Sequence, residues 1–581
     1  MDIIREIIEM LRLVDRPTAY LMVFTPAWLA VLVVLAIAFR KKPKKVFKVL
    51  AFIPLAHFVV FYLLNYTKGV PVLGIARYGP HLVAALIYLL ACLIVARGKH
   101  KIIPLIVSGI LAVAVSGWTV FYVLAFGSAY HFGNFSHQRY EKSMASLIDE
   151  LEENYILKEY KGVDFDELRQ KYIPLAAEAG KNKDEAAFAE AVANLCYEFH
   201  DGHLAIRITD DDLACVVREN MAGNDYGFSM IRTDDGRVTA ILTDEDSDAY
   251  RQGIRDGVEI ISWDGVPVGE AISEVRCVSP NISILAYPIA ENEEVFKPMF
   301  LAGMGGESVS VGFVGVDGLE KEVRITGSGS YFDRLYAATS ALTHKWCDEF
   351  AYTEMLDEHC GYICIPRESY DDKKDIEAAL NDDYPEVREL VISRIDDLKA
   401  QGMDRLIIDL RDNDGGLDVV YEEIVALFAT EDFVCFGGFR EGDSIVTSDK
   451  WAWTVRADGR YSDIPVVVLV NAGCASSGDL LAYRLSLCNN VTLMGITTTW
   501  GSAQALGGEI LMSGGNIGVR YPIIATLDEN EEVLLDAGPD RKSSVELDVK
   551  IPLDDKAVHI IYDLGADYEL MYARHYLNGE I

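Results

Sequence analysis

The chain has 581 residues, half of them hydrophobic, and at roughly 150 residues per domain this length predicts three or four domains. Lys and Arg number 53 against 89 Asp and Glu, so the net charge is -36. This composition excludes a disordered polymer and a protein that coats nucleic acid. We therefore expect a folded, multi-domain protein with no nucleic-acid partner.

The charge is divided unevenly along the chain. Residues 1–126 hold 14 basic and 4 acidic residues, a net charge of +10, which leaves 39 basic and 85 acidic residues, or -46, for the rest. A basic, apolar beginning followed by a strongly acidic body predicts a membrane region joined to a soluble part.

Four apolar stretches have about the length that a bilayer requires: Leu21–Phe39, Val46–Tyr66, His81–Ala96 and Ile102–Phe126. They predict a transmembrane region of four helices over residues 1–127, with the lipid bilayer as a partner. The basic loops at 40–45 and 97–101 are expected to stay in the cytoplasm. This places the protein in the cell membrane as a multi-pass protein with its soluble body on the extracytoplasmic side.

The ten cysteines contain no CxxC pair, and nine of them follow the predicted membrane region. This pattern excludes a zinc ribbon and does not favour a disulfide framework in so large a body. Cys360 and Cys364 alternate with apolar residues in GYICIP, which predicts a strand with small buried thiols.

The body is expected to begin with a helical part over residues 128–222. Apolar residues recur three and four apart between 138 and 199, as in amphipathic helices. A turn then presents His200, Asp201, Gly202 and His203 before a short strand, LAIRI.

Residues 223–327 contain short strands separated by Gly and Asp turns around one brief helix. The unit resembles a PDZ domain in Gly253-Ile254, the turns at Asp256-Gly257 and Asp264-Gly265, and the strand Val258–Trp263. The resemblance implies a domain that receives an extended peptide as an added strand. The alternative is a small barrel that only spaces other parts.

Residues 328–581 alternate apolar runs of the parallel-strand type with helical patterns, which predicts an α/β layered domain. RLIIDL, VVVLVN and VTLMGI are the expected strands. DVVYEEIVALFA and SGDLLAYRLSL are among the expected helices.

Two segments of this domain carry candidate chemistry. In LIIDLRDNDGGLD a strand leads into Gly415 and Gly416, whose N–H groups can stabilise an oxyanion, although such a turn is commonly only a turn. In VVVLVNAGCASSGDLLAYRL, Ser476 stands at the start of a helix, a position that suits a nucleophile. It equally suits a helix cap, a task that Ser477 or Asp479 can share.

Together, DLRDNDGG and NAGCASSGD, in this order and after a PDZ-like unit, resemble the C-terminal processing, or tail-specific, serine peptidases. The resemblance covers most of residues 140–560. It implies a hydrolase of the serine endopeptidase type with Ser476 as nucleophile. It also implies an oxyanion hole formed by the N–H groups of Ser477 and of Gly415 or Gly416.

The sequence departs from most of this family at the base. The usual Lys is absent, Ser502 stands at its position, and no Lys occurs between Lys450 and Lys542. A minority branch, which includes the tricorn-type peptidases, uses a His before the PDZ unit and an acid beyond the Ser. By this resemblance His203 in FHDGHLAI is the base and Asp536 the acid, with Glu546 as the alternative acid.

Other interpretations of these residues remain open at this stage. His203 can instead be a turn histidine bonded to a local carbonyl, while His200 with His203 lacks the further ligands of a metal site. We expect no metal and no cofactor, and a peptide or protein as substrate. The competing hypothesis is a catalytically inactive peptide-binding sensor or scaffold, and a transporter is weakened by the lack of acidic residues in the apolar stretches. The natural substrate and the oligomeric state are not determined by the sequence.

Overall fold

The structure, a computed structural model, describes residues 44–64, 79–97 and 131–581 together with six isolated residues between 31 and 114, apart from 280–282, 344–346, 348, 382, 443 and 448–450. The chain divides into two compact units, each described by itself. Unit 1 combines 1–155, 169–180 and 506–523, and unit 2 combines 156–168, 181–505 and 524–581.

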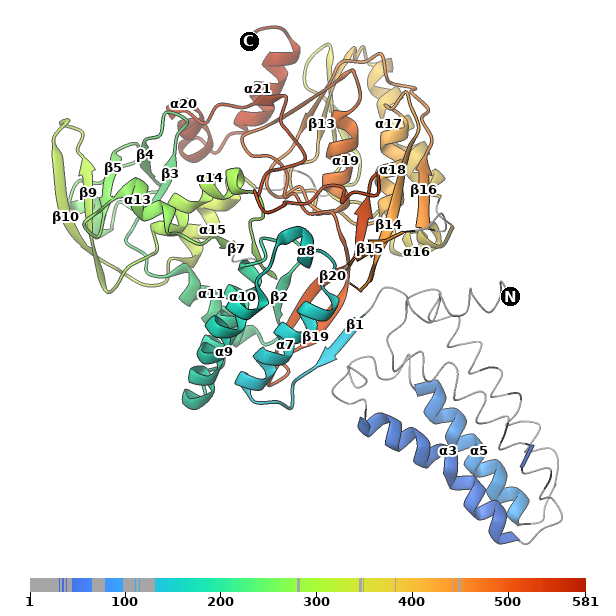
Figure 1. Ribbon diagram of the computed structural model, residues 1–581. Coiled ribbons are helices and arrows are strands. Elements are labelled where there is room, and N and C mark those ends of the chain that lie inside the picture. The colour runs from blue at the N-terminus through green and yellow to red at the C-terminus, as the bar shows by residue number, and fades with distance from the viewer. Residues whose placement is uncertain are drawn as a thin grey trace. The chain divides into compact units, whose positions relative to one another are not determined.

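Among its described residues, unit 1 contains two helices ahead of residue 100, a further helix, and strands that lie far apart in the sequence (Figure 1). Its elements are α3 (Lys44–Leu64), α5 (Gly79–Ala96), β1 (His131–Asn134) and α7 (Tyr140–Asn154). Three elements cross the boundary between the units: α9 (Phe165–Asn182), β19 (Ala505–Leu511) and β20 (Ile517–Leu527). β1 pairs with β19 in parallel, so segments near residues 131 and 508 meet in this unit.

The expected membrane region is contradicted. Within the described part of the chain, no helix combines the length and apolarity that a membrane span requires. α3 contains Lys44, Lys45, Lys48 and His57, and α5 has 18 residues, close to the minimum for a span. The predicted four-helix transmembrane region and multi-pass localisation are therefore wrong on this finding, and the stretches Leu21–Phe39 and Ile102–Phe126 lie almost entirely outside the described residues.

Unit 2 is built around a six-stranded sheet in the order β11-β12-β13-β17-β18-β21. All neighbouring strands are parallel except β11 and β12, which are antiparallel. The strands are β11 (Tyr352–Met355), β12 (Cys360–Cys364), β13 (Arg405–Asp409), β17 (Val466–Leu469), β18 (Val491–Gly495) and β21 (Val549–Lys550). The α/β domain predicted from the sequence is present, with β12, β13, β17 and β18 at the predicted strands.

The parallel strands are apolar on both faces because helices cover both. On β13, Leu406 and Ile408 belong to one buried cluster and Ile407 to another, as the alternation of a strand requires. The first cluster lies under α17, α18 and α19, and the second faces α21. The helices of this domain are α16 (Asp372–Asn381), α17 (Pro385–Ala400), α18 (Asp418–Ala426), α19 (Ser477–Ser486), α20 (Asp555–Val558) and α21 (Tyr568–Leu577), with a π-helical turn at His559–Asp563.

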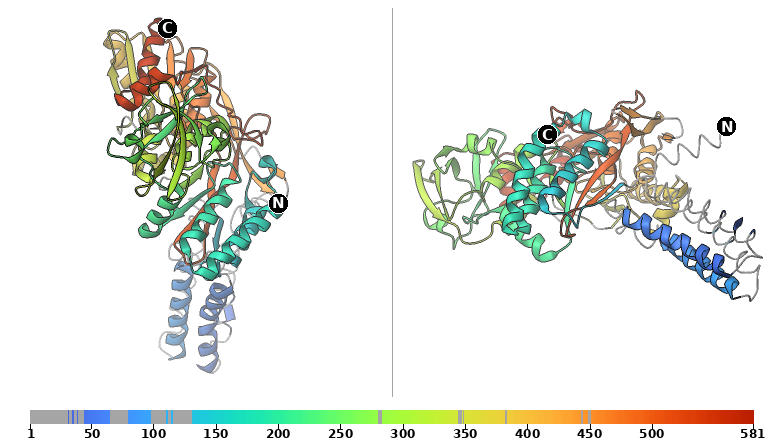
Figure 2. Two further views of the ribbon diagram at one scale, coloured as in Figure 1. Left: turned by 90° about the vertical axis from the view of Figure 1, so that its left-hand side faces the viewer. Right: turned by 60° about the horizontal axis from the view of Figure 1, so that its bottom comes forward.

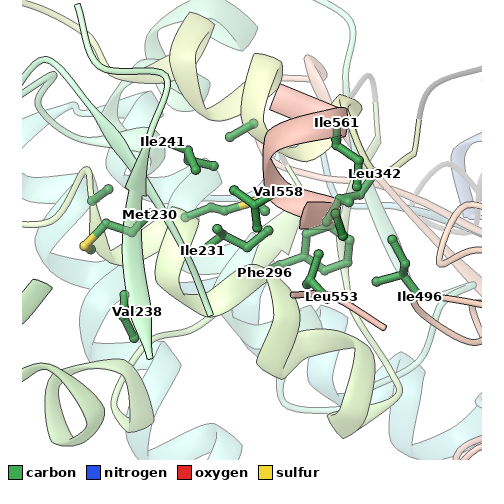
Figure 3. Packing of buried hydrophobic residues seen from close by; sticks show 14 of the residues in the cluster. Met230, Ile231, Val238, Ile241, Phe296, Leu342, Ile496, Leu553, Val558 and Ile561 are labelled. Carbon is green, nitrogen blue, oxygen red and sulfur yellow. The ribbon is translucent and has the colours of Figure 1, made fainter. Parts of the chain in front are cut away.

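Within residues 223–327, most strands form a separate antiparallel sheet in the order β10-β9-β5-β4-β3 in unit 2 (Figures 1 and 2), whereas β7 and β8 pair in another sheet that contains β2. The elements of the separate sheet and its helices are β3 (Ser229–Arg232), β4 (Val238–Ile241), α12 (Asp248–Arg251), β5 (Glu259–Trp263), β6 (Val266–Pro267), α13 (Val268–Ser273), α14 (Ala290–Leu301), β9 (Ser308–Val314) and β10 (Glu320–Thr326), followed by α15 (Phe332–Ser340). Buried side chains of β3 and α14 belong to the same hydrophobic cluster as side chains of the carboxyl-terminal segment. Figure 3 shows Ile231 and Phe296 packed near Leu553 and Val558.

The other elements of unit 2 complete the surroundings of the site. They are α8 (Lys158–Lys161), α10 (Glu185–Tyr197), β2 (Ala205–Ile208), α11 (Asp211–Ala222), β7 (Val278–Ser279), β8 (Ser283–Ala286), β14 (Phe433–Glu441), β15 (Ser444–Val446) and β16 (Ala452–Val455). The helices expected between 138 and 199 and the short strand after His203 are present. The nine-residue strand β14 was not predicted, because Gly437 and Gly438 interrupt its alternation.

One cysteine expectation is also wrong. Cys364, at the end of β12, forms a disulfide with Cys347 rather than remaining a free thiol. Cys360, on the same strand, is a free and buried thiol as predicted. The alternation within GYICIP established the strand but carried no information about a partner 17 residues earlier.

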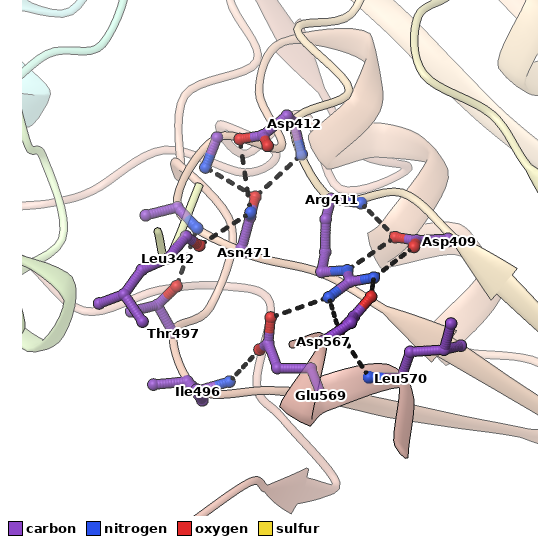
Figure 4. A network of polar contacts seen from close by, with 12 residues as sticks. Leu342, Asp409, Arg411, Asp412, Asn471, Ile496, Thr497, Asp567, Glu569 and Leu570 are labelled. Atoms are coloured by element: carbon purple, nitrogen blue, oxygen red, sulfur yellow. Dashed lines mark hydrogen bonds and ion pairs between the residues drawn. The ribbon is translucent and has the colours of Figure 1, made fainter. Parts of the chain in front are cut away.

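A buried network of charges fastens α21 to the end of β13 (Figure 4). The Arg411 guanidinium contacts the carboxylates of Asp409, Asp567 and Glu569 at 2.6, 2.7 and 3.3 Å, and its side chain is 2% exposed. Glu569 also accepts the backbone N–H of Ile496 at 2.8 Å. Burial raises the pKa of Glu569 to about 7, and Arg411 opposes this rise. One cation therefore holds three acidic groups, which lie on β13 and at the start of α21.

We predict that Arg411→Met lowers the free energy of unfolding by about 3–5 kcal/mol, because it leaves buried carboxylates without their cation. Urea denaturation followed by tryptophan fluorescence measures this change. Arg394→Met is the control, since Arg394 pairs with an exposed Glu349 and its loss should cost at most about 1 kcal/mol. Equal midpoints for the two variants would contradict the prediction.

Candidate active site

The turn that carries Ser476 follows the carboxyl end of β17 and leads directly into α19. Ser476 has φ 61° and ψ -127°, a backbone conformation that costs a non-glycine residue free energy. Its side chain makes no capping hydrogen bond to the helix, so the capping interpretation of this serine does not apply. The strained turn leaves the hydroxyl available to a partner outside the helix.

That partner is His203, from the turn between α10 and β2. Its Nε2 lies 3.1 Å from the Ser476 Oγ, across 273 positions of sequence. The Asp201 carboxylate accepts the backbone N–H of His203 at 2.7 Å and so fixes the turn. Ser476 and His203, predicted from motifs far apart in the chain, are therefore in hydrogen-bonding contact.

The other ring nitrogen of His203 contacts Ser502, the residue that stands where a lysine was expected. Nδ1 lies 2.9 Å from the Ser502 Oγ. If Nε2 accepts the Ser476 proton, Nδ1 carries a hydrogen and donates it to Ser502. The Ser502 hydroxyl lies 3.2 Å from the Asp201 Oδ1 and 3.2 Å from the Asp536 Oδ2, so it can donate in turn to either carboxylate.

Asp536 therefore reaches the imidazole through Ser502. The direct contact expected between Asp536 and His203 is not among the interactions of the described residues. The Asp536 side chain is fully buried and forms an ion pair with Lys161, whose side chain is 3% exposed. Glu546, the alternative acid, is exposed and lies outside this group of contacts.

Burial shifts the pKa values of His203 and Asp536 in opposite directions. It lowers the pKa of His203 below the ordinary value of 6.5, with Lys161 lowering it further and Asp201 opposing. Burial also raises the pKa of Asp536 above its usual range, and the positive charge of Lys161 opposes that rise. A neutral imidazole is the form that can accept a proton from a serine hydroxyl.

Asp479 holds the loop that presents Ser502. Its buried carboxylate, one turn beyond Ser476 on α19, accepts the backbone N–H groups of Gly501 at 2.9 Å and Ser502 at 3.3 Å. Burial raises the pKa of Asp479 to about 7, while these hydrogen bonds oppose the rise. The Ser476 N–H donates to the Ser502 carbonyl at 3.2 Å, which ties the same two turns together again.

The glycine turn after β13 lies against the Ser476 turn. A Cβ atom at Gly415 would lie 2.7 Å from the Ala475 carbonyl oxygen and 2.7 Å from the Ser476 Cβ, so only glycine fits there. Two predicted oxyanion donors have internal partners: Gly415 N–H donates to the Asn413 Oδ1 at 2.9 Å, and Gly416 N–H donates to the Ser477 Oγ at 2.8 Å. Ser477 begins α19, where first-turn N–H groups lack partners within the helix.

Asn471 links the glycine turn after β13 to the Ser476 turn after β17. Its Oδ1 accepts the backbone N–H groups of Asp412 and Gly473, both at 2.9 Å, as Figure 4 shows in part. One side chain therefore sets the spacing of the glycine turn after β13 and the serine turn after β17.

The metal interpretation of the two histidines has no support in the described residues, which contain no group of three or more His, Cys, Asp or Glu side chains suited to a metal ion. The His200 ring packs edge-on against Tyr197, and its backbone carbonyl accepts a hydrogen bond from Lys161 at 3.0 Å. Burial lowers the pKa of His200 to about 4, so this imidazole is neutral at pH 7.

The sequence analysis did not assign roles to Asp201, Ser502 or Lys161. Asp201 stands in the HDGH turn and Ser502 occupies the vacant lysine position, so both carried a signal in sequence. Lys161 carried none, because nothing in a helical segment indicates contact with an acid 375 positions away.

The comparisons address the part of this site that lies in the α/β domain. Residues 359–538 match the model of peptidase family S41, and they include Ser476, Ser502, Asp536 and both oxyanion glycines. This segment is therefore similar to peptidase family S41. His203, Asp201 and Lys161 lie ahead of the S41 match.

Two curated relatives share sequence with the chain. The carboxyl-terminal-processing protease of Synechocystis sp. (strain ATCC 27184 / PCC 6803 / Kazusa) is 36% identical over 102 residues, which are 17% of this chain and 22% of the relative. The corresponding protease of Picosynechococcus sp. (strain ATCC 27264 / PCC 7002 / PR-6) is 34% identical over 109 residues, 19% and 24% of the two chains. The chain thus spans less than a quarter of the length of these relatives.

Solved structures are more distant. The crystal structure of mature CPAF is 14% identical, covers 74% of this chain and 95% of its own, and has a TM-score of 0.47. The tricorn protease structure is 15% identical, covers 76% of this chain and 37% of its own, and has a TM-score of 0.32.

We predict that Gly415→Ala destabilises the S41 domain more than Gly442→Ala does. Both glycines have positive φ, 83° and 65°, so either change costs roughly 1–2 kcal/mol in backbone strain. Only the Gly415 variant adds a clash with the Ser476 turn, worth about 1–3 kcal/mol more, because a Cβ at Gly442 meets open space. Urea midpoints measure the difference, and equal midpoints would show that the two turns are not in close contact.

Proposed function

We propose that this chain is a serine endopeptidase in which Ser476 is the nucleophile and His203 the general base. The observation that carries the proposal is the 3.1 Å contact between the His203 Nε2 and the Ser476 Oγ, with the far ring nitrogen held by Ser502. A serine hydroxyl is a weak nucleophile until a base removes its proton, and this imidazole lies within reach of that proton.

In the proposed reaction the Ser476 oxygen bonds to the peptide carbonyl carbon while its proton moves to the His203 Nε2. The carbonyl oxygen becomes an oxyanion. His203 then gives the proton to the leaving nitrogen as the C–N bond breaks, and an acyl-serine remains. Water, deprotonated by the same imidazole, hydrolyses this ester and regenerates Ser476. The scheme requires no cofactor.

Asp536 acts through Ser502 in this scheme, and Asp201 shares the role. Both carboxylates lie 3.2 Å from the one Ser502 hydroxyl, which accepts from the imidazole. Their negative charge stabilises the imidazolium that forms when His203 takes up the proton. The third member of the proposed triad is thus an acid pair acting through a serine hydroxyl.

The proposed oxyanion hole consists of the N–H groups of Ser477 and of Gly415 or Gly416. The Ser477 hydroxyl now accepts the Gly416 N–H, so a rotation of this side chain must precede use of that donor. A peptide carbonyl that enters between the two turns would take the place of the hydroxyl as acceptor.

The substrate in this proposal is a peptide or protein, delivered by the PDZ-like unit over residues 223–327. β3 lies at one edge of that unit's sheet, with α14 beside it. An edge strand beside a helix is an arrangement to which an extended peptide can add as a further strand.

A catalytically inactive peptide-binding sensor or scaffold is the second candidate. The internal hydrogen bonds of the Gly415 and Gly416 amides favour it, because an active oxyanion hole needs free donors. Chemical reactivity of Ser476 distinguishes the two candidates.

We expect a fluorophosphonate probe to label the wild-type chain at Ser476 and to leave Ser476→Ala unlabelled. His203→Gln should lose at least about 100-fold in labelling rate, because the general base is gone. Ser486→Ala is the matched control on α19 and should label at the wild-type rate. The Ser486 hydroxyl donates to the Tyr483 carbonyl and has no other polar contact among the described residues. Intact-protein mass spectrometry measures the adduct. An unlabelled wild type, under conditions where a control hydrolase reacts, would support the inactive candidate.

The pH dependence of labelling follows from the burial of His203. Because its pKa lies below the ordinary 6.5, more than half of the imidazole is neutral at pH 6.5, so labelling at that pH should exceed half of its maximum. Labelling then falls at lower pH as His203 becomes protonated. Rate constants measured between pH 4.5 and 8.5 test this, and a midpoint above 6.5 would contradict the neutral buried base.

A further inference from the structure

Lys161, at the end of α8, makes three polar contacts with the segments that carry Asp201 and Asp536. Its ammonium forms the ion pair with Asp536 and donates to the backbone carbonyls of His200, at 3.0 Å, and of Ala537. An ammonium group has three hydrogens, so these contacts use all of its donors. Its side chain is 3% exposed, which removes it from solvent.

The two carbonyls are adjacent to the two acids. His200 immediately precedes Asp201, and Ala537 immediately follows Asp536. The ammonium therefore joins the turn after α10 to the segment after β20, and the Ser502 hydroxyl lies between the carboxylates of these same two segments. Tyr160, the preceding residue, adds a hydrogen bond from its hydroxyl to the Asp536 carbonyl at 3.0 Å.

Lys161 also contributes to the net charge of the buried set formed by Asp201, Asp536, Lys161 and His203. With Asp201 and Asp536 ionised and Lys161 protonated, the charges sum to -1. When His203 accepts a proton from Ser476, the sum becomes zero. Without Lys161 the resting sum would be -2, and a buried site of that charge would hold a proton on an acid or on the imidazole before any substrate arrived.

We propose that Lys161 is a positioning residue that keeps the resting charge of the Asp201–Asp536–Ser502 relay at -1, so that His203 remains neutral and able to accept the Ser476 proton. The inference rests on the proposed function, to which it adds a residue outside the S41 match. Lys161 touches neither the nucleophile nor the imidazole among its described contacts, and it acts on both through the acids.

The other charged groups near the relay do not perform this task. Asp479 binds backbone N–H groups of Gly501 and Ser502. Arg541 is paired with Glu293 at 2.8 Å and acts on His200, whose imidazole is neutral at pH 7. Asp540 acts on Tyr160, whose pKa it raises. Lys161 is the cation that bonds a relay carboxylate directly.

A series of charge variants tests the proposal through the pH profile of fluorophosphonate labelling. Lys161→Met sets the resting sum at -2, Asp536→Asn sets it at zero, and the double variant restores -1. The acid limb of the profile is the pH range in which labelling falls as His203 becomes protonated. We expect it to move to higher pH by about one unit in Lys161→Met and to lower pH in Asp536→Asn. The double variant should return the limb to the wild-type position. A purely structural role would lower the rate at every pH without moving the limb.

Lys158→Met is the matched control on the same helix, since Lys158 pairs with the partly exposed Glu159, and its limb should stay in place. Lys161→Arg keeps the charge and should keep the limb even if the rate falls. If Lys161→Met does not fold, as judged by circular dichroism, Asp536→Asn and Lys161→Arg still decide. An unshifted limb in Asp536→Asn, or a double variant displaced as far as Lys161→Met, would overturn the proposal.

A second measurement separates this inference from the proposed function. NMR of histidine-labelled protein, with the His203 signal assigned by His203→Gln, gives the His203 pKa in each variant without any reaction. A wild-type chain that is never labelled would reject the peptidase proposal. The role of Lys161 would still be supported if the His203 pKa is highest in Lys161→Met, intermediate in the wild type and lowest in Asp536→Asn. Labelling without that order would reject Lys161 alone.

Discussion

The Ser502 hydroxyl is the interaction on which the candidate site depends. It lies 2.9 Å from the His203 Nδ1 and 3.2 Å from each of two carboxylates, so it joins the ring to both acids and holds the ring's orientation. Without it, neither carboxylate would be joined to the His203 imidazole through a hydroxyl. Ser502 occupies the position at which the family resemblance led us to expect a lysine, and an imidazole from another segment contacts it here.

The arrangement requires that several turns meet at one edge of a sheet. In parallel sheets the carboxyl ends of neighbouring strands lie together, and β13, β17 and β18 lead into the glycine turn, the Ser476 turn and the Ser502 loop respectively. Asn471 and Asp479 then fix the spacing of these turns through backbone N–H groups. The Arg411 network fastens α21 behind the same edge, so the site is supported from the far side of the sheet.

Burial gives the site its chemistry and also its cost. A buried histidine stays neutral, as a base requires, but buried acids tend to take up protons unless a cation lies nearby. Lys161 supplies that cation at Asp536, as Arg411 does for Asp409 and Asp567. A buried cation held directly against a buried carboxylate thus appears both in the scaffold and in the proposed relay.

The sequence by itself determined the α/β domain, its main strands, the positions of Ser476 and His203, and the glycine turn, because each of these follows from local periodicity or from a contiguous motif. It did not determine the route from Asp536 to His203, the disulfide between Cys347 and Cys364, or the presence of Lys161. These depend on contacts between segments up to 375 positions apart, and no local pattern encodes which distant side chains meet. Hydropathy alone also predicted membrane spans that the described helices do not provide, because an apolar run records composition and not how the folded chain uses it.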